Sequence, residues 1–463
     1  MAHLHALIGY FFRVLSLTYG AAPFQQLLMQ IVCGHLLGDK PFETCAADSS
    51  VQAASARWLL AMNVAEQLAA LAVLTVAGTI IDLLGCRTAM ILSATASLVQ
   101  SIVYLLVALA PSRFPLAAVV FTNVLCGFLG TIVTFKMAAS AFLTRTTHIE
   151  HRTRYFLYLD AVQAIAIVGP FLGGTVTKLF GFVVTFGVMV AISSVMLLHL
   201  IFLFPNVDVS ENSTLNASLS VKSLQAAFLE SVGATKASIQ LIFKYRSSTS
   251  LLAALTILGF LLPTAQVFFV FYPSKVWGWT SFEFGKFALF ANLQKVAWLS
   301  LILPWILSFA RNRGHDKLGW EIFVLRASLA FTTLGEFCYG TVSTDTAFTL
   351  CTLLASMSCF GIPTIRSLLS TLVAPSHQGR LFGGIQIFEN VASLLAMIGF
   401  SYLYQLTVDT AVPQAIFLVM GTALLVAFLT VLFGVDLSGV VRMGQDSAVD
   451  EGSRFTEDSP LIQ

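Results

Sequence analysis

The charged side chains that lie inside long apolar stretches are the residues of this chain best suited to chemistry. A charge in hydrocarbon costs roughly 2.5–3.5 kcal/mol on insertion scales, so such residues usually face a cavity or an opposite charge. They are Glu66, Lys136, Asp160, Lys295, Glu336, Arg366 and Glu389. Because carboxylates in such surroundings can load and release protons near neutral pH, we expect proton exchange at some of them.

Two of the acids stand in polar stripes with the same spacing. In each stripe an amide is followed three and four residues later by a glutamate and a second amide: Asn63, Glu66 and Gln67, and Gln386, Glu389 and Asn390. Side chains at this spacing share one helix face. We predict that Glu66 and Glu389 are proton sites facing a cavity or a seam between helices. The alternative is a permanent hydrogen bond to a neighbouring helix.

Cations and neutral polar groups provide further candidates. Lys295 shares a helix face with Asn292 and lies too deep to reach water easily, so it could attract an anionic solute or neutralise Glu389. Arg366 lies at the end of its apolar run, where it could close a gate with an acid from the first half of the chain. Further candidates for hydrogen bonds to a solute are Gln26, Gln30, Asn123 and Gln266.

The composition places these residues in a protein that crosses a lipid bilayer many times. Hydrophobic residues make up 57% of the chain and charged residues 10%, whereas soluble domains have about a quarter charged. The formal net charge of +2 is too small to favour nucleic-acid binding. The sequence lacks a phosphate-binding Gly-rich loop with lysine and any Cys/His metal spacing, so we expect neither an enzyme nor a metal or other cofactor.

Twelve apolar runs, each long enough for a spanning helix of about 20 residues, divide the chain six plus six. They lie at 8–32, 58–81, 88–109, 115–143, 155–178, 182–204, 249–272, 284–309, 320–340, 346–372, 381–406 and 413–434. We predict an all-α integral membrane fold of twelve transmembrane helices. Its parts are a six-helix bundle over 1–205, a linker with an amphipathic helix over 206–248, a second six-helix bundle over 249–436 and a disordered tail over 437–463.

Loop charges predict the orientation. Most loop lysines and arginines lie on the side of the two termini and the linker, which predicts that both termini are cytosolic. We expect the plasma membrane; an acidic-dileucine pattern over 457–462 makes an endosomal, vacuolar or lysosomal membrane the alternative.

The cysteines divide into two groups by position. Cys33 and Cys45 flank the first outer loop, where a disulfide can persist, and whether they pair stays open. The others lie within or beside apolar runs, where we interpret them as small buried hydrophobes. They are Cys86, Cys126, Cys338, Cys351 and Cys359.

A ten-residue turn between the second and third runs combines two glycines, an acid and a base. These are Gly78, Asp82, Gly85 and Arg87. The turn resembles the Gly-x-Leu-Ala-Asp-Arg-x-Gly-Arg-Lys signature of the major facilitator superfamily, although Leu83 and Cys86 stand where two of its bases are expected. The resemblance implies a conformational latch in which Asp82 and Arg87 pair.

A second run, Gly169-Pro170-Phe171-Leu172-Gly173-Gly174, resembles the second half of the antiporter signature of the same superfamily. Glycines let helix backbones approach closely, and proline weakens the helix ladder. We therefore predict a bendable helix seam at Gly169, Pro170, Gly173 and Gly174.

Longer segments narrow the resemblance. The stretches 45–52, 152–156, 365–370 and 379–389 look like a fungal group of major facilitator proteins, many of which accompany secondary-metabolite pathways. Arg366-Ser367-x-x-Ser370 and Gln378-Gly379-x-Leu381-Phe382 are also similar to the proton-coupled folate transporter family. In that branch an acid early in the fifth helix takes part in proton coupling, and Asp160 occupies the matching place. The nearby Asp of the fourth helix and a histidine of the seventh helix are missing here.

These resemblances imply a secondary transporter that works by alternating access, with a small organic molecule, protons and the lipid bilayer as its partners. We expect a monomer. The leading hypothesis is proton-driven export of a small apolar metabolite or xenobiotic. A proton-coupled importer of folate-like or other organic anions is the alternative, and a non-transporting membrane sensor or scaffold is an alternative from another class.

Overall fold

The structure is a computed structural model. It describes residues 2–38, 40–111, 114–146, 158–159, 162, 166, 168–205, 243, 246–302, 317–370, 378–410 and 412–438. Within these ranges it describes only the backbone of 2, 74–80, 82–84, 144–145, 260, 262–267, 300, 317, 370 and 378–388. Most of the predicted linker, most of the tail and the proton-site candidate Asp160 lie outside the described residues.

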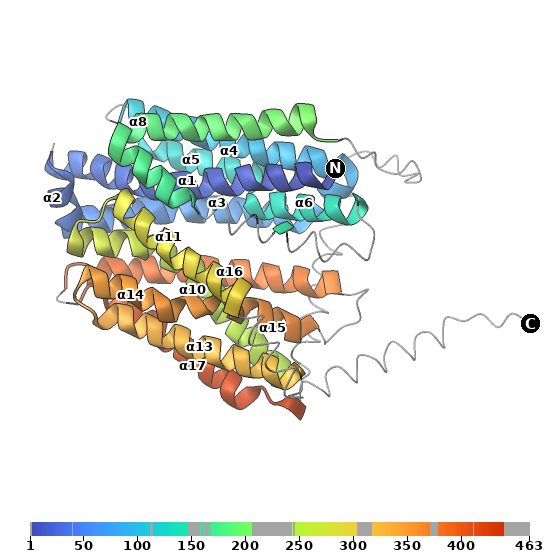
Figure 1. Cartoon of the computed structure of the whole chain (residues 1–463). Helices are drawn as coiled ribbons and strands as arrows, with labels where there is room; N and C mark the ends of the chain where they lie inside the picture. The colour runs from blue at the N-terminus through green and yellow to red at the C-terminus, as the bar shows by residue number, and fades with distance from the viewer. Residues whose placement is uncertain are drawn as a thin grey trace, which may run out of the picture. The chain divides into compact units, whose positions relative to one another are not determined.

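The helices of the first 205 residues follow the predicted apolar runs, except for the short α2, which lies between the first two runs (Figure 1). They are α1 (Ala2–Leu37), α2 (Phe42–Ala47), α3 (Ser49–Leu84), α4 (Cys86–Leu109), α5 (Leu116–Leu129), α6 (Ile132–Thr146), α8 (Gly169–Leu198) and the π-helical η1 (His199–Leu203). The predicted run 115–143 is split because Gly130 has a φ of 116°, which side chains other than glycine rarely adopt. Gly181, with a φ of 81°, interrupts α8 in the same way where the fifth run passes into the sixth.

The later helices also match the predicted runs. They are α10 (Arg246–Trp277), α11 (Ser281–Ala297), the π-helical η2 (Trp298–Ile302), α13 (Lys317–Thr341), α14 (Asp345–Ala355), the 3₁₀ helix η3 (Ser356–Phe360), α15 (Gly361–Ser370), α16 (Gln378–Thr407) and α17 (Ala415–Gly434). The eighth run therefore changes helix type at Trp298, and the tenth run contains a 3₁₀ turn between α14 and α15.

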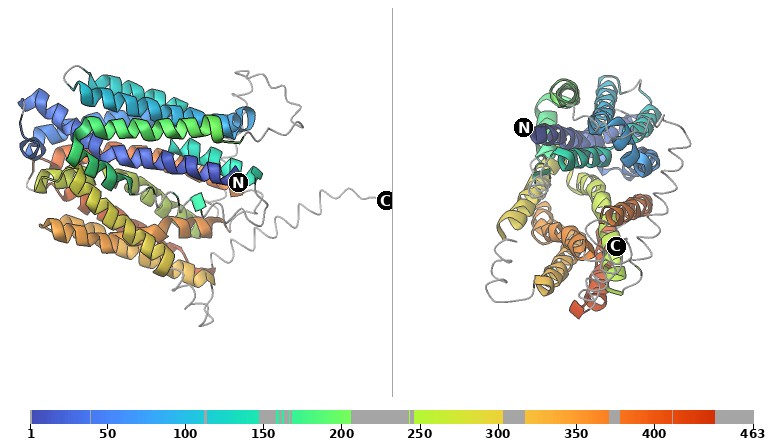
Figure 2. Two further views of the ribbon diagram at one scale, coloured as in Figure 1. Left: turned by 45° about the horizontal axis from the view of Figure 1, so that its top comes forward. Right: turned by 90° about the vertical axis from the view of Figure 1, so that its right-hand side faces the viewer.

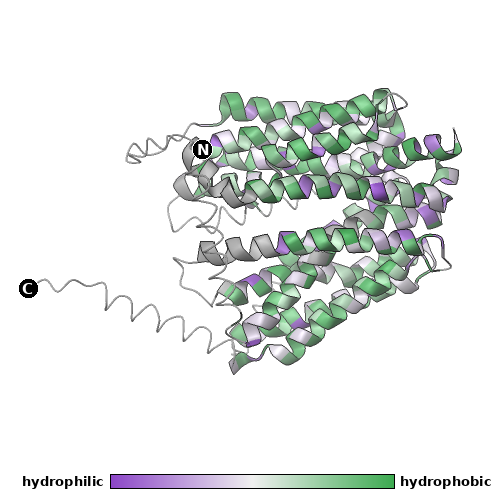
Figure 3. Cartoon of the chain, turned by 180° about the vertical axis from the view of Figure 1, so that it is seen from behind, coloured by the Kyte–Doolittle hydropathy of each residue, from purple (hydrophilic) through white to green (hydrophobic). Residues whose placement is uncertain are grey.

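Among the described residues, six helical stretches are long and apolar enough to cross a membrane. They are Cys86–Leu109, Leu116–Leu143, Gly169–Leu203, Leu318–Thr341, Asp345–Leu369 and Ala415–Gly434. Figure 3 shows that hydrophobic residues predominate along the coloured helices. Large apolar side chains such as Phe121, Phe202 and Phe433 are more than two-thirds exposed, as expected for surfaces that face lipid.

The chain divides into two compact units. Unit 1 comprises 1–231, 267–292 and 401–410, and unit 2 comprises 232–266, 293–400 and 411–463. Within unit 1, α1 and α4 both pack against α8, and α3 packs against α5. Within unit 2, α13 packs against α14 and α17, where the rings of Tyr339, Phe348 and Phe417 meet with centroids 4.7–5.8 Å apart. Figure 2 shows how the helices run within each unit.

Two disulfides join neighbouring helices. Cys33 at the end of α1 pairs with Cys45 of α2, which decides the question left open by the sequence. Cys338 pairs with Cys351, so interpreting these two as separate buried hydrophobes was wrong. The short connection from α13 to α14 turns the chain back on itself. It brings the Cα atoms of the two cysteines to 5.9 Å from each other, within the usual range for a disulfide.

Candidate functional site

An ion pair between α15 and α16 is the best-defined charged pair of unit 2. The Arg366 Nη2 atom donates to Oε2 of Glu389 at 2.7 Å. Glu389 is 7% exposed, and its other oxygen, Oε1, has no hydrogen-bond partner among the described residues. Gly259 of α10 faces it, since a Cβ atom there would lie 3.4 Å from Glu389 Cγ. The arginine side chain is 41% exposed. One end of the pair is thus buried and the other reaches the surface.

Two further charged groups of the same unit, on α11 and α13, influence each other electrostatically. Half-buried Lys295 interacts electrostatically with Glu336, which is 8% exposed, and with the thiol of Cys359 on η3. Glu336 Oε2 is buried and lacks a hydrogen-bond partner within the described ranges. The two roles considered for Lys295, attracting an anionic solute and neutralising Glu389, stay predictions. Arg366 pairs with an acid of its own unit, and the expected gate with an acid from the first half of the chain stays a prediction.

Unit 1 contains a buried cation, Arg13, that the sequence did not lead us to expect as a site residue. Arg13 on α1 is only 4% exposed, and its Nε atom donates to Ser93 Oγ on α4 at 3.4 Å. It interacts electrostatically with Glu66, which is half-buried on α3. A buried cation needs such a countercharge, because removing it from water costs several kcal/mol. The position of Arg13 inside the first apolar run was the available signal.

Hydroxyl groups form a buried network at the centre of unit 1. Oγ atoms from α1, α4 and α8 meet there: Ser16 and Ser193 at 2.8 Å, Ser101 and Ser193 at 3.0 Å, and Ser16 and Ser97 at 3.3 Å. Such contacts hold membrane helices together, because hydrocarbon offers hydroxyl groups no other partner.

The neutral candidates have different environments. Asn123 is buried on α5 and accepts a hydrogen bond from Gln100 of α4 at 3.3 Å. Gln30 and Asn292 are half-buried, and the side chain of Gln266 lies outside the described residues. Asn123 is thus engaged within unit 1, whereas Gln30 and Asn292 keep part of their surface open.

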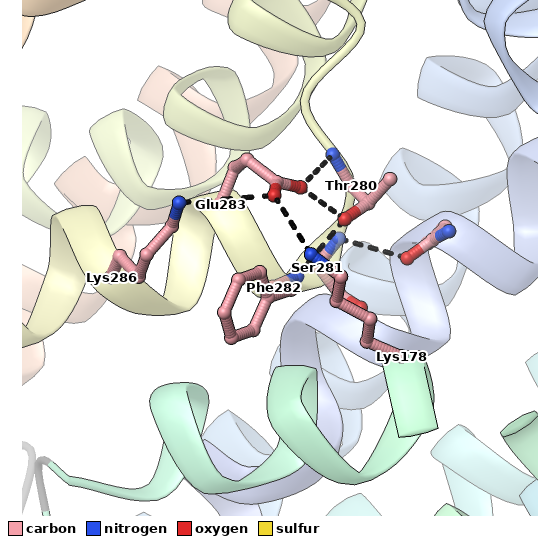
Figure 4. Close-up of polar contacts among 7 residues, drawn as sticks. Lys178, Thr280, Ser281, Phe282, Glu283 and Lys286 are labelled. Carbon is pink, nitrogen blue, oxygen red and sulfur yellow. Dashed lines mark hydrogen bonds and ion pairs between the residues drawn. The ribbon is translucent and has the colours of Figure 1, made fainter. Parts of the chain in front are cut away.

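Gln26 of α1 binds the start of α11. Its Oε1 atom accepts from the backbone N–H of Ser281 at 2.8 Å, so the side chain caps an otherwise unsatisfied helix terminus. Figure 4 shows the surrounding contacts: the Thr280 N–H donates to Glu283 Oε2 at 3.1 Å, as in a capping box, and Lys178 of α8 lies 3.9 Å from Glu283 Oε1. The Lys178 ammonium also lies 4.1 Å from the centre of the Phe282 ring.

The glycine-rich start of α8 contacts two helices. A Cβ atom at Gly173 would collide with the carbonyl oxygen of Tyr19 on α1, and one at Gly169 would lie 2.9 Å from the Tyr19 nitrogen. A Cβ atom at Gly174 would collide with the Ser281 carbonyl of α11. On the α11 side, a Cβ atom at Gly285 would lie 2.7 Å from the carbonyl oxygen of Pro170. The run therefore packs against α1 and α11 at distances that side chains would prevent.

The turn between α3 and α4 binds η1. Gly85 ends α3 with a φ of 84°, and Arg87 donates through Nε to the Leu200 carbonyl at 3.2 Å and through Nη2 to the Ile201 carbonyl. Only the backbone of Gly78 and Asp82 is described, so the expected Asp82–Arg87 pair stays a prediction.

The sequence of this chain is similar to those of known membrane transporters. No family model matches the chain. It is 21% identical over 362 residues to the MFS-type transporter avaJ of Aspergillus versicolor, covering 73% of this chain and 69% of the relative. It is 25% identical over 393 residues to the proton-coupled folate transporter of Rattus norvegicus, covering 80% and 79%.

Solved structures show the same fold. A D-xylose-proton symporter superimposes with a TM-score of 0.65 at 10% identity, covering 95% of this chain and 98% of the other. The human organic anion transporter MFSD10 gives 0.60 at 16% identity, covering 93% and 98%. The predicted major facilitator fold, twelve helices in a lipid bilayer, is therefore confirmed. Together with the curated relatives, it indicates a secondary transporter of a small molecule and not an enzyme.

Proposed function

We propose that this protein works by alternating access and couples the movement of a small organic molecule to protons. The ion pair between Arg366 and Glu389 is the observation that carries this proposal, because a buried acid with a half-exposed basic partner can exchange protons without unfolding its surroundings. Two similar proteins are named for proton coupling: a proton-coupled folate transporter and a D-xylose-proton symporter. The moving parts are the two predicted six-helix halves.

Protonation would change the pair in a simple way. A neutral Glu389 loses most of its attraction for the guanidinium of Arg366, which is then free to bind another acceptor or water. The cost of leaving a charge partly buried then favours a different arrangement of α15 and α16. Proton binding and helix movement are coupled through one hydrogen bond in this scheme. Glu66, with its partner Arg13, is the corresponding candidate in unit 1.

The direction we favour is export of a small apolar metabolite or xenobiotic across the plasma membrane by a monomer with both termini in the cytosol. The similarity to the fungal MFS-type transporter and the glycine-rich start of α8 support this direction. Proton-coupled import of folate-like or other organic anions is the second candidate. The similarity to two proton-coupled folate transporters and the cations Lys295 and Arg366 favour it.

Gene deletion combined with two transport measurements separates these candidates. Loss of export of the cell's own apolar metabolites supports the first candidate, and loss of labelled folate uptake supports the second. Re-expression of the wild-type protein should restore the lost activity, whereas Glu389→Gln should not. If the purified protein in vesicles moves no solute from a broad panel, the transport proposal fails and a sensor or scaffold role replaces it.

A further inference from the structure

The start of α3 is held by a disulfide-bonded segment. The Cys33–Cys45 bond attaches α2 to the end of α1. Asp48, between α2 and α3, caps α3 by accepting from the N–H groups of Ser50 and Val51 at 2.9 and 3.1 Å. Gln52 reaches back from α3 and donates to the carbonyl of Ala46 at 2.8 Å. The first turn of α3 is thus fixed to α1 and α2.

A lysine from a distant part of the sequence binds this same turn. Lys275, near the end of α10, donates through Nζ to the Ser49 hydroxyl at 2.7 Å and to the carbonyl of Val408, just beyond α16. Ser49 itself donates to Val408 at 3.4 Å. Asp48 and Asp409 supply negative charge around the ammonium group. One cation therefore connects the ends of three helices.

Two further hydrogen bonds join α3 to α16 at this end. The Tyr404 hydroxyl donates to Gln52 Oε1 at 3.3 Å, and Arg57 Nε donates to Gln405 Oε1 at 2.8 Å. One turn below Gln52, the hydroxyl of Ser55 is completely buried and lacks a hydrogen-bond partner in the described part of the chain. A buried orphan hydroxyl costs free energy, which it would recover if this end opened to water.

We propose that these residues form a clasp, defined as Ser49, Gln52, Lys275, Tyr404 and Val408, that closes this end of unit 1 and releases during transport. The Cys33–Cys45 disulfide is its brace, because it holds the turn that supplies Ser49 and Gln52. The clasp consists of polar contacts, which can be exchanged for water at small net cost, whereas the covalent brace stays intact. The start of α3 then separates from α10 and α16 with its acceptors still in position.

This inference rests on the proposed alternating access, but its test does not require a transported solute. A reporter cysteine, Ser55→Cys, is placed behind the clasp after the three cysteines outside the disulfides are replaced by alanine. Maleimide labelling of the reporter in vesicles then measures how often this end opens. We expect Lys275→Gln to raise the labelling rate roughly tenfold, which corresponds to about 1.4 kcal/mol. Lys40→Gln, which changes an exposed lysine of the neighbouring loop, should leave the rate unchanged.

Two further variants separate release from misfolding. Ser49→Ala removes one acceptor and should raise the rate less than Lys275→Gln does. Joint replacement of Cys33 and Cys45 by alanine should raise it as well, because the turn loses its brace. Each variant must elute as the same monodisperse species as the wild type. Equal labelling rates for Lys275→Gln and Lys40→Gln would overturn the clasp. Increased labelling in a protein that transports nothing would retain the clasp and refute the proposed function.

Discussion

Replacing Glu389 by glutamine should lower the free energy of unfolding, because it breaks the ion pair with Arg366. The size of the loss depends on how deeply the two side chains are buried. Breaking a fully buried pair costs about 3–5 kcal/mol, because the remaining charge has no partner. An exposed pair contributes only about 0.2–1 kcal/mol. The glutamate side chain is 9% exposed and the arginine 41%, so solvent screens one partner only. We therefore expect an intermediate loss of about 1–2 kcal/mol.

A double-mutant cycle measures this pair directly. Glu389→Gln, Arg366→Gln and the double variant are compared by their free energies of unfolding in mixed micelles titrated with SDS. We expect a coupling energy of about 1 kcal/mol or more between the two sites. The pair of Glu283 and Lys286, at 3.9 Å and with both side chains at least 29% exposed, is the control and should couple by less than about 0.5 kcal/mol. Equal coupling in both cycles would refute the buried ion pair.

Three further perturbations test other parts of the structure by the same unfolding measurement. The hydrogen bond from a nearby serine hydroxyl lowers the pKa of Asp48, so its stabilisation is present above the unfolded pKa of about 3.9 and is lost as the pH falls through the folded value. Asp48→Ala should therefore cost about 1 kcal/mol at pH 7 and nothing in strong acid; an equal cost at both pH values contradicts this. Gly174→Ala should cost about 1–3 kcal/mol because its Cβ meets a backbone carbonyl, whereas Gly187→Ala, which meets nothing within 4 Å, should be neutral or stabilising. Arg13→Gln should cost about 1–3 kcal/mol, because the buried Ser93 hydroxyl loses its donor, and Arg13→Lys should cost less; a cost below about 0.5 kcal/mol would contradict this role of Arg13.

The positions of the helices were predictable because the apolar runs are long enough to span a bilayer. A run of this length in lipid must be helical to satisfy its backbone hydrogen bonds. The breaks at Gly130 and Gly181 were not, since glycine permits a positive φ without requiring it. Both breaks depend on how the flanking helices pack, which the local sequence does not encode.

The candidate site was predictable as a set of residues but not as a set of contacts. Glu389 stands out in one dimension because a charge in an apolar run is costly, whereas its pairing with Arg366 depends on how α15 and α16 pack. Gln26 shows the same limit: its partner Ser281 lies 255 residues away, so a side chain expected to bind a solute caps a helix instead. The Cys338–Cys351 disulfide depends on a helical hairpin whose facing sides the spacing does not specify.

Proton movement driven by a solute tests the central claim most directly. Purified protein in proteoliposomes that contain a pH-sensitive dye is supplied with solutes ranging from apolar aromatic metabolites to folates. We predict that at least one solute drives proton movement through the wild-type protein and that Glu389→Gln abolishes this movement. Solute transport without any accompanying proton movement, or the same proton movement in Glu389→Gln, would contradict the account.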